Sequence, residues 1–182
     1  MRYYEREHFD AYARIKNEGL HQWNDLHEEL AGYEDFPNRP LLERTLPVVA
    51  PGQRSRILEY GCGTGPAACF LAERGYGVHG IDLVPDAIEI AQQQASERKL
   101  NIRFEVADIC QWEGEAEQYD VVLDSFCLQS IVLDADRDAV LNGVRRRRSQ
   151  TGAMCSQLLS MSMPVTTGRT ATTRPRASCG RP

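Results

Sequence analysis

A short strand followed by a glycine-rich turn constrains this chain more than any other stretch. Residues 56–65 read Arg-Ile-Leu-Glu-Tyr-Gly-Cys-Gly-Thr-Gly, and Pro66 then opens an apolar run that continues to Leu71. The pattern predicts a strand, a tight turn and a helix. Glycine lets the backbone approach a ligand closely because no Cβ intervenes, and the helix start offers unpaired N–H groups. The stretch therefore predicts a ligand-binding turn.

Three more apolar stretches follow, separated from one another by helical patterns. The predicted strands are Val78–Leu83, Ile102–Asp108 and Tyr119–Asp124, and helices are predicted to begin at Pro66, Pro85 and Asp136. Strands that alternate with helices form parallel, right-handed βαβ units. The predicted fold class is therefore α/β, with an open parallel sheet flanked by helices.

Each of the four predicted strands ends in an acidic residue. These residues are Glu59, Asp82, Asp108 and Asp124. In an open parallel sheet, a ligand binds outside the carboxyl ends of the strands, where the strand order reverses. We therefore expect the four carboxylates to surround one site.

The spacing of Asp82 favours a ligand that contains adenosine. This residue lies about 20 positions beyond the glycines, where a carboxylate accepts hydrogen bonds from both ribose hydroxyls. A dinucleotide is disfavoured, because Pro66 occupies the place of the third glycine in Gly-x-Gly-x-x-Gly. Glu59 precedes the turn, where it would repel a pyrophosphate. A carboxylate at that position suits a ligand with a cationic amino-acid end.

These residues resemble the class I S-adenosylmethionine-dependent methyltransferases. The resemblance covers about residues 50–145 and rests on four motifs in order: Glu59 to Gly65, Gly80 to Leu83, Ala107 to Ile109, and Tyr119 to Asp124. It implies a Rossmann-like fold, S-adenosylmethionine as cofactor and a small-molecule methyl acceptor. The residues after the fourth strand, Asp124-Ser125-Phe126-Cys127, differ from the Asn/Asp-Pro-Pro-Tyr motif of enzymes that methylate amino groups in nucleic acids and proteins.

The resemblance also implies how the first two motifs hold the cofactor. Glu59 and the backbone of Gly61 and Gly63 would hold its methionine end. Asp82 would bind the ribose hydroxyls, with Leu83 packed beside the adenine.

The third and fourth motifs complete the implied site. Asp108 would accept a hydrogen bond from the adenine amino group, and Ile109 would cover the ring. Asp124 would border the methyl-transfer site, but its position suits a helix N-cap equally well. For Leu83 and Ile109, the alternative to contact with the adenine is ordinary packing in the core.

The implied reaction needs no particular catalytic side chain. The sulfonium is already a reactive methyl donor, so the rate depends largely on the alignment of nucleophile, methyl group and sulfur. A general base is needed only when the acceptor is protonated, and we assign no catalytic residue. Cys127 is interpreted as a small buried side chain, with a reactive nucleophile as the disfavoured alternative.

Residues 1–46 are predicted to form an N-terminal helical cap. Aromatic and aliphatic residues recur there at three- and four-residue steps until Pro37 and Pro40 interrupt the pattern. Core packing is the favoured interpretation, because aromatic stripes at this spacing mostly face a core. The alternative is a lid that brings side chains into the site, namely Tyr3, Tyr4, His8, Tyr12 or His27.

Composition sets the remaining bounds. No apolar run approaches the roughly 20 residues of a membrane span and the N-terminus has no signal-peptide core, so we expect a cytoplasmic protein. Six cysteines without a Cys-x-x-Cys pair argue against a metal site and a disulfide framework. The first 144 residues hold all 26 acidic side chains but only 13 of the 21 basic ones, which disfavours nucleic acid as a partner.

The pattern changes abruptly after Val144. Residues 145–182 contain eight arginines and no acid, and no strand pattern is visible in them. We therefore assign residues 47–147 to the cofactor-binding domain and 148–182 to a disordered tail outside the family. Reading suitable codons for residues 149–152 one base earlier gives Lys-Pro-Asp-Gly, a turn that the family would have here. This favours out-of-frame translation from about residue 148 over a natural basic tail.

A sheet that stops after the fourth strand would leave Val121 to Leu123 on an unpaired edge. Such edges pair with other chains, so the sequence predicts a possible homodimer through this edge. The first functional hypothesis is a methyltransferase. The second is a cofactor-binding fragment without catalytic competence, and a third, weaker one is a nicotinamide-dependent oxidoreductase.

Overall fold

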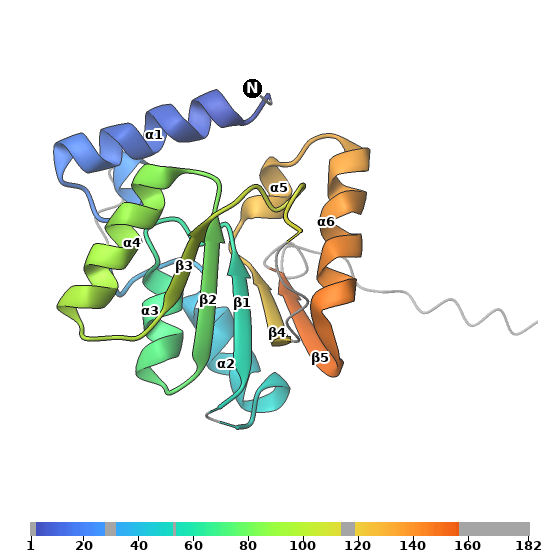
Figure 1. Cartoon of the computed structure of the whole chain (residues 1–182). Coiled ribbons are helices and arrows are strands. Elements are labelled where there is room, and N and C mark those ends of the chain that lie inside the picture. The colour runs from blue at the N-terminus through green and yellow to red at the C-terminus, as the bar shows by residue number, and fades with distance from the viewer. Residues whose placement is uncertain (1–2, 28–31, 53, 114–118, 157–182) are drawn as a thin grey trace, which may run out of the picture.

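The computed structural model of the chain describes residues 3–27, 32–52, 54–113 and 119–156, with side chains as far as residue 148. A parallel sheet with the strand order β3-β2-β1-β4-β5 forms its centre (Figure 1). The strands are β1 (Arg56–Tyr60), β2 (Gly77–Asp82), β3 (Arg103–Val106), β4 (Tyr119–Asp124) and β5 (Arg148–Ser156). The α/β class, the Rossmann-like arrangement and the order 3-2-1-4 of the first four strands are confirmed.

Helices connect β1 to β2, β2 to β3 and β4 to β5, as βαβ units require. They are α3 (Pro66–Glu73), α4 (Pro85–Glu97), the short α5 (Cys127–Ser130) and α6 (Asp134–Arg147). Pro66 and Pro85 each open a helix, since the fixed φ and missing N–H of proline suit the first turn. The N-terminal segment forms α1 (Glu5–Glu18), the 3-10 helix η1 (Trp23–His27) and α2 (Arg39–Val49). Figure 1 shows α1 and α5 at the same end of the sheet.

Apolar layers cover both faces of the sheet. On one face, residues of α2 and α3 pack against Ile57, Val78 and Leu123. On the other, Val140 and Val144 of α6 pack against residues of β1, β2 and β4. Burial on both faces explains why β4 reads as a continuous apolar run instead of an alternating one.

The sheet extends one strand further than the sequence predicts. β5 pairs with β4 in parallel register from Val121↔Ala153 to Asp124↔Ser156, with an irregularity nearer its start. The prediction that the sheet is truncated after the fourth strand is therefore wrong, and β4 is not an edge strand. The predicted homodimer loses the unpaired β4 edge on which it was based. The rest of the predicted tail, residues 157–182, lies outside the described residues.

A substitution at Gly80 tests the packing within the sheet. A Cβ at this position would lie 2.8 Å from two ring carbons of Phe104 and 3.1 Å from Sγ of Cys62. We expect Gly80→Ala to lower the free energy of unfolding by about 1–3 kcal/mol, since overpacking forces neighbours to shift. Gly77→Ala on the same strand is the control, because the atoms nearest to its Cβ are 4.0 Å away. Urea denaturation measures both; equal stabilities would contradict the predicted packing.

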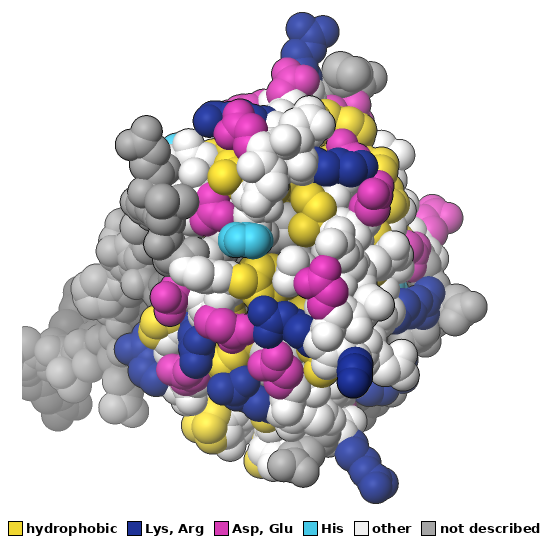
Figure 2. Space-filling model, turned by 90° about the vertical axis from the view of Figure 1, so that its left-hand side faces the viewer, with side chains coloured by type: hydrophobic (Ala, Val, Ile, Leu, Met, Phe, Trp, Pro, Cys, Tyr) yellow, Lys and Arg dark blue, Asp and Glu magenta, His cyan; other side chains and the backbone are white. Residues whose placement is uncertain are grey.

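Charges of both signs are mixed on the surface drawn in Figure 2. Lys16 of α1 forms ion pairs with Asp86 and Glu89 of α4, and Arg98 forms ion pairs with Glu34 and Glu73. This face therefore lacks the single-sign basic patch that nucleic acids favour.

In the part of the chain that the structure describes, no helix is both long enough and apolar enough to cross a membrane.

Candidate active site

A cavity of about 570 Å³ lies beyond the carboxyl ends of β1, β2 and β4. This volume falls in the ordinary range for small-molecule sites. Seven of the eight predicted site residues line it: Glu59, Gly61, Gly63, Asp82, Leu83, Asp108 and Ile109. The structure therefore brings together residues from the first three motifs, as the topology predicts.

Glu59 is the last but one residue of β1 and lies in a fully buried environment. Its side chain is 1% exposed, and its Oε1 accepts a hydrogen bond of 2.5 Å from Oγ of Ser125. Its Oε2 is buried without a hydrogen-bond partner among the described residues. Burial raises the pKa of Glu59 to about 8, with the Ser125 bond acting against the rise and the nearby Asp82 adding to it. An unpartnered buried carboxyl oxygen of this kind suits a cationic ligand group.

The glycine turn makes close approaches that a larger residue would prevent. Gly61 and Gly63 both have a positive φ, +68° and +55°. A Cβ on Gly61 would lie 2.5 Å from Cβ of Cys127, and one on Gly63 would lie 2.5 Å from the hydroxyl of Tyr12. The turn thus forms a cradle that has no room for a Cβ at Gly61 or Gly63.

Asp82 ends β2 and organises the turn beside it. Its Oδ2 accepts from the N–H of Gly63 at 2.9 Å, and its Oδ1 accepts from the N–H of Val84 at 2.9 Å. Burial raises the pKa of Asp82, while these two N–H groups act in the opposite direction. The carboxylate is therefore held at a fixed place on the cavity wall.

Asp108 follows β3 and lies at another part of the wall. Its Oδ1 accepts from the N–H of Cys110 at 2.9 Å, and the hydroxyl of Tyr4 lies 3.3 and 3.4 Å from its two oxygens. Tyr4 belongs to the N-terminal segment, 104 residues earlier. Asp108 is thus the point where the N-terminal segment meets the third motif.

Asp124 does not line the cavity with the other predicted residues. Its side chain is fully buried, and its Oδ1 accepts from the N–H groups of Cys127 and Leu128 at 3.0 and 3.1 Å. These are the first N–H groups of α5. Asp124 thus holds the start of α5 from two residues before the N-cap position, which Phe126 occupies.

Helix α1 contributes more to the cavity than the favoured core interpretation allowed. Tyr4, His8 and Tyr12, spaced by four residues, all line the cavity, as does His27 of η1. Nδ1 of His8 lies 2.8 Å from the carbonyl oxygen of Tyr4, so this nitrogen donates and carries the proton. Tyr12 also packs in a core cluster with Ile15, so the same face of α1 serves both purposes.

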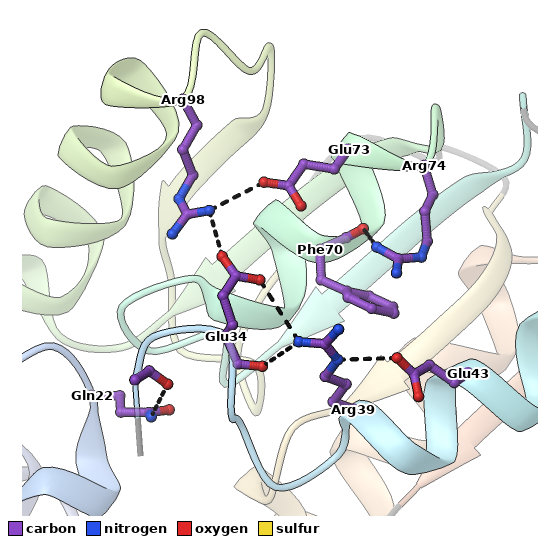
Figure 3. Close-up of polar contacts among 9 residues, drawn as sticks. Gln22, Glu34, Arg39, Glu43, Phe70, Glu73, Arg74 and Arg98 are labelled. Carbon is purple, nitrogen blue, oxygen red and sulfur yellow. Dashed lines mark hydrogen bonds and ion pairs between the residues drawn. The ribbon is translucent and has the colours of Figure 1, made fainter. Parts of the chain in front are cut away.

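Asn38 was not recognised from the sequence. Its side chain is buried and lines the cavity, and its Nδ2 donates to Oγ of Ser125 at 3.0 Å. An ion-pair network holds the segment before it: Glu34 bonds to both Arg39 and Arg98, as Figure 3 shows. Nearby, the Tyr33 hydroxyl donates to the carbonyl of Thr64 at 3.0 Å. The segment is thereby fastened to the glycine turn and to α4.

Three free thiols line the cavity. Cys62, Cys110 and Cys127 line it as free cysteines. Burial raises the pKa of Cys62 and of Cys127 well above the usual value, so both thiols stay protonated and weakly nucleophilic. Within the described ranges, no group of three or more His, Cys, Asp and Glu side chains is placed to hold a metal ion.

The sequence profile of a methyltransferase domain matches residues 57–152, which is more than half of the chain. The chain belongs to the methyltransferase domain family. The resemblance to the methyltransferases is thereby confirmed. The match also continues past residue 148, into the segment that the sequence had assigned to a tail outside the family.

Individual relatives of this methyltransferase domain agree with the family. The chain is 38% identical over 79 residues to 2-heptyl-1-hydroxyquinolin-4(1H)-one methyltransferase of Mycobacteroides abscessus, which covers 43% of the chain and 35% of the relative. It is 33% identical over 121 residues to aklanonic acid methyltransferase DauC of a Streptomyces species, covering 64% and 53%. The chain thus spans about half or less of the length of these relatives.

A solved structure shows the same fold. An S-adenosylmethionine-dependent methyltransferase from Clostridium acetobutylicum superposes with a TM-score of 0.61 at 15% identity, over 81% of this chain and 56% of the other. The chemistry of the cavity residues also fits the cofactor of the methyltransferase family, independently of the similarity in sequence. The buried Oε2 of Glu59 has no hydrogen-bond partner among the described residues, and the cradle at Gly61 and Gly63 has no room for a Cβ.

Proposed function

We propose that this chain transfers the methyl group of S-adenosylmethionine to a small-molecule acceptor. The single observation that carries the proposal is the unpartnered, buried Oε2 of Glu59 beside the glycine cradle. Glu59 would bind the ammonium group of the methionine end, and Asp82 would accept from the ribose hydroxyls. Asp108 would accept from the adenine amino group. The sulfonium supplies the reactive methyl group, and these residues hold it in one orientation.

The small-molecule acceptor is supported by the chemistry of the rest of the cavity lining. Apolar and aromatic side chains there include Trp23, Phe36 and Phe126, with Asn24, Gln129 and Ser130 as neutral polar groups. The cavity lining among the described residues contains no lysine or arginine. The two relatives are named for 2-heptyl-1-hydroxyquinolin-4(1H)-one and for aklanonic acid, which are both small molecules.

A titration calorimetry experiment tests cofactor binding. We expect saturable binding of S-adenosylmethionine, no binding of NADH, and at least a tenfold loss of affinity in Asp82→Asn, because charged hydrogen bonds to the ribose contribute about 1.5–3 kcal/mol. Asp86→Asn is the matched control, since Asp86 lies four residues later and pairs with Lys16 at the surface. Binding of NADH, or equal affinity of both variants and wild type, would contradict the proposal.

A second candidate is cofactor binding without turnover. It is kept because none of the described cavity residues is assigned a catalytic role. Formation of S-adenosylhomocysteine with 2-heptyl-1-hydroxyquinolin-4(1H)-one or aklanonic acid as test acceptors would exclude it. Binding of S-adenosylmethionine with no product from either acceptor would favour it.

A further inference from the structure

Three polar side chains form a hydrogen-bonded chain that ends at Glu59. Nδ2 of Asn38 donates to Oγ of Ser125 at 3.0 Å, and Oγ of Ser125 donates to Oε1 of Glu59 at 2.5 Å. The three residues come from the start of α2, the segment after β4 and the end of β1. The hydroxyl of serine has one proton to donate, so both bonds have a single consistent direction.

The side chain of Asn38 bonds to Ser125 instead of capping the helix that follows it. It occupies the N-cap position of α2, yet its side chain forms no capping hydrogen bond. Asparagine at an N-cap normally contributes about 1 kcal/mol through such a bond. Its amide instead reaches Ser125, 87 residues away in the sequence. This arrangement favours a role in the cavity over a role in the helix.

The chain fixes one oxygen of Glu59 and leaves the other one open to a ligand. Oε1 is held by Ser125, whereas the buried Oε2 has no hydrogen-bond partner among the described residues. Several titratable side chains interact electrostatically with Glu59. They are Asp82 from β2, Tyr12 from α1, Tyr33, Cys62 and Cys69. None of these is cationic. A charged Glu59 would therefore be uncompensated until a cation arrives.

We propose that Glu59 is a proton-exchange site, at which the incoming ammonium group of the cofactor displaces a proton, and that Asn38 and Ser125 are its positioning residues. This inference rests on the proposed function. In the empty cavity the carboxyl group carries its proton on Oε2. On loading, the O–H bond breaks, the proton leaves to solvent and the carboxylate pairs with the ammonium group. Burial raises the pKa of Glu59 to about 8, so the protonated form predominates at pH 7.

Two ligands separate this site from the rest of the cavity. S-adenosylhomocysteine carries the ammonium group, whereas 5′-methylthioadenosine has the same nucleoside and sulfur but no amino-acid end. Both ligands would contact Asp82 and Asp108 in the same way. Any proton released or taken up at those two acids is therefore equal for the two ligands and cancels in the difference. Only S-adenosylhomocysteine would reach Glu59 with a cation.

The experiment is calorimetry on the full chain in buffers of different ionisation enthalpy. At pH 7 we expect S-adenosylhomocysteine to release about one proton more than 5′-methylthioadenosine, because a group with a pKa near 8 is mostly protonated there. The difference should fall as the pH rises through 8, because Glu59 then loses its proton before the ligand arrives. In Glu59→Gln it should vanish, with a loss of affinity for S-adenosylhomocysteine and little change for 5′-methylthioadenosine.

The pH midpoint of proton release tests the role of the positioning residues, because a merely structural role would not change it. Ser125→Ala removes the bond that lowers the pKa of Glu59, so the midpoint of proton release should move to higher pH. Ser130→Ala, also on the cavity wall, should leave that midpoint unchanged. Equal proton release by the two ligands, with both bound, would overturn the inference and leave the proposed function intact. Binding of neither ligand by the folded protein would overturn both.

Discussion

Gly61→Ala is expected to lower the free energy of unfolding by about 2–4 kcal/mol. Two causes add together at this position. Gly61 has a φ of +68°, a conformation that costs a residue with a Cβ roughly 1 kcal/mol or more. The new Cβ would also lie 2.5 Å from Cβ of Cys127. Cβ is anchored directly to the backbone, so the whole start of α5 would have to shift, at a cost of about 1–3 kcal/mol.

The matched control for Gly61→Ala is Gly19→Ala. Gly19 ends α1 with the same φ of +68°, but nothing lies within 4 Å of a Cβ there. It therefore isolates the conformational cost, and we expect only about 1 kcal/mol. Urea denaturation measures the stability of both variants, and calorimetry measures their affinity for S-adenosylhomocysteine. Gly61→Ala should lose affinity as well, because Ser125 would move with Cys127. A Gly61→Ala variant no less stable than Gly19→Ala would contradict the close packing of turn and helix.

The second large effect is a dependence of stability on pH that comes from Glu59. Its pKa is about 8 in the fold against 4.5 for the free side chain. The fold therefore binds this proton more tightly than the unfolded chain does. The resulting stability is complete below pH 4.5 and declines as pH rises toward 8, by about 1.4 kcal/mol per pH unit. Asp82, whose pKa burial also raises, contributes in the same direction.

Glu59→Gln should remove the decline of stability with rising pH, because glutamine has nearly the same shape as glutamate but does not titrate. We expect the variant to be more stable than wild type at pH 8 by several kcal/mol and nearly equal at pH 5. Denaturation at pH 5, 6, 7 and 8 measures the slope, and Glu97→Gln at an exposed position of α4 is the control. Identical slopes for wild type and Glu59→Gln would show that Glu59 is not a buried, proton-binding group. The same variant should bind S-adenosylhomocysteine worse, so stability and ligand affinity would change in opposite directions.

The sheet as far as β4 follows from the sequence, since its elements carry strong local signals. β4 has the predicted bounds, and α3 and α4 begin at the predicted prolines. Strand β5 was missed because its residues, Arg-Ser-Gln-Thr-Gly-Ala-Met-Cys-Ser, carry little apolar or β-branched character. Backbone pairing with β4 provides strand hydrogen bonds whatever the side chains are. Out-of-frame translation of the C-terminal segment stays a prediction, which the coding DNA tests directly.

The candidate site was predictable where a residue lies at the end of a strand and not elsewhere. Glu59, Asp82 and Asp108 meet because parallel strands bring their carboxyl ends to one edge. Tyr12 carried no separate signal, because a stripe that faces the core and one that faces a cavity have the same helical period. Asn38 was hidden for a different reason. An asparagine before a helix predicts a cap, and only the missing capping bond shows that it is used otherwise.

The contact between Tyr3 and the segment before α6 has a consequence for synthesis on the ribosome. The Tyr3 hydroxyl accepts from the N–H of Val132 at 2.6 Å, across 129 residues of sequence. At roughly 5–20 residues per second, translation takes about 6–26 s to cover that distance. The contact of Tyr3 can therefore form only after that time. The apolar face of α1 packs against Val84 and Ala87, so it stays exposed only until those residues have been synthesised.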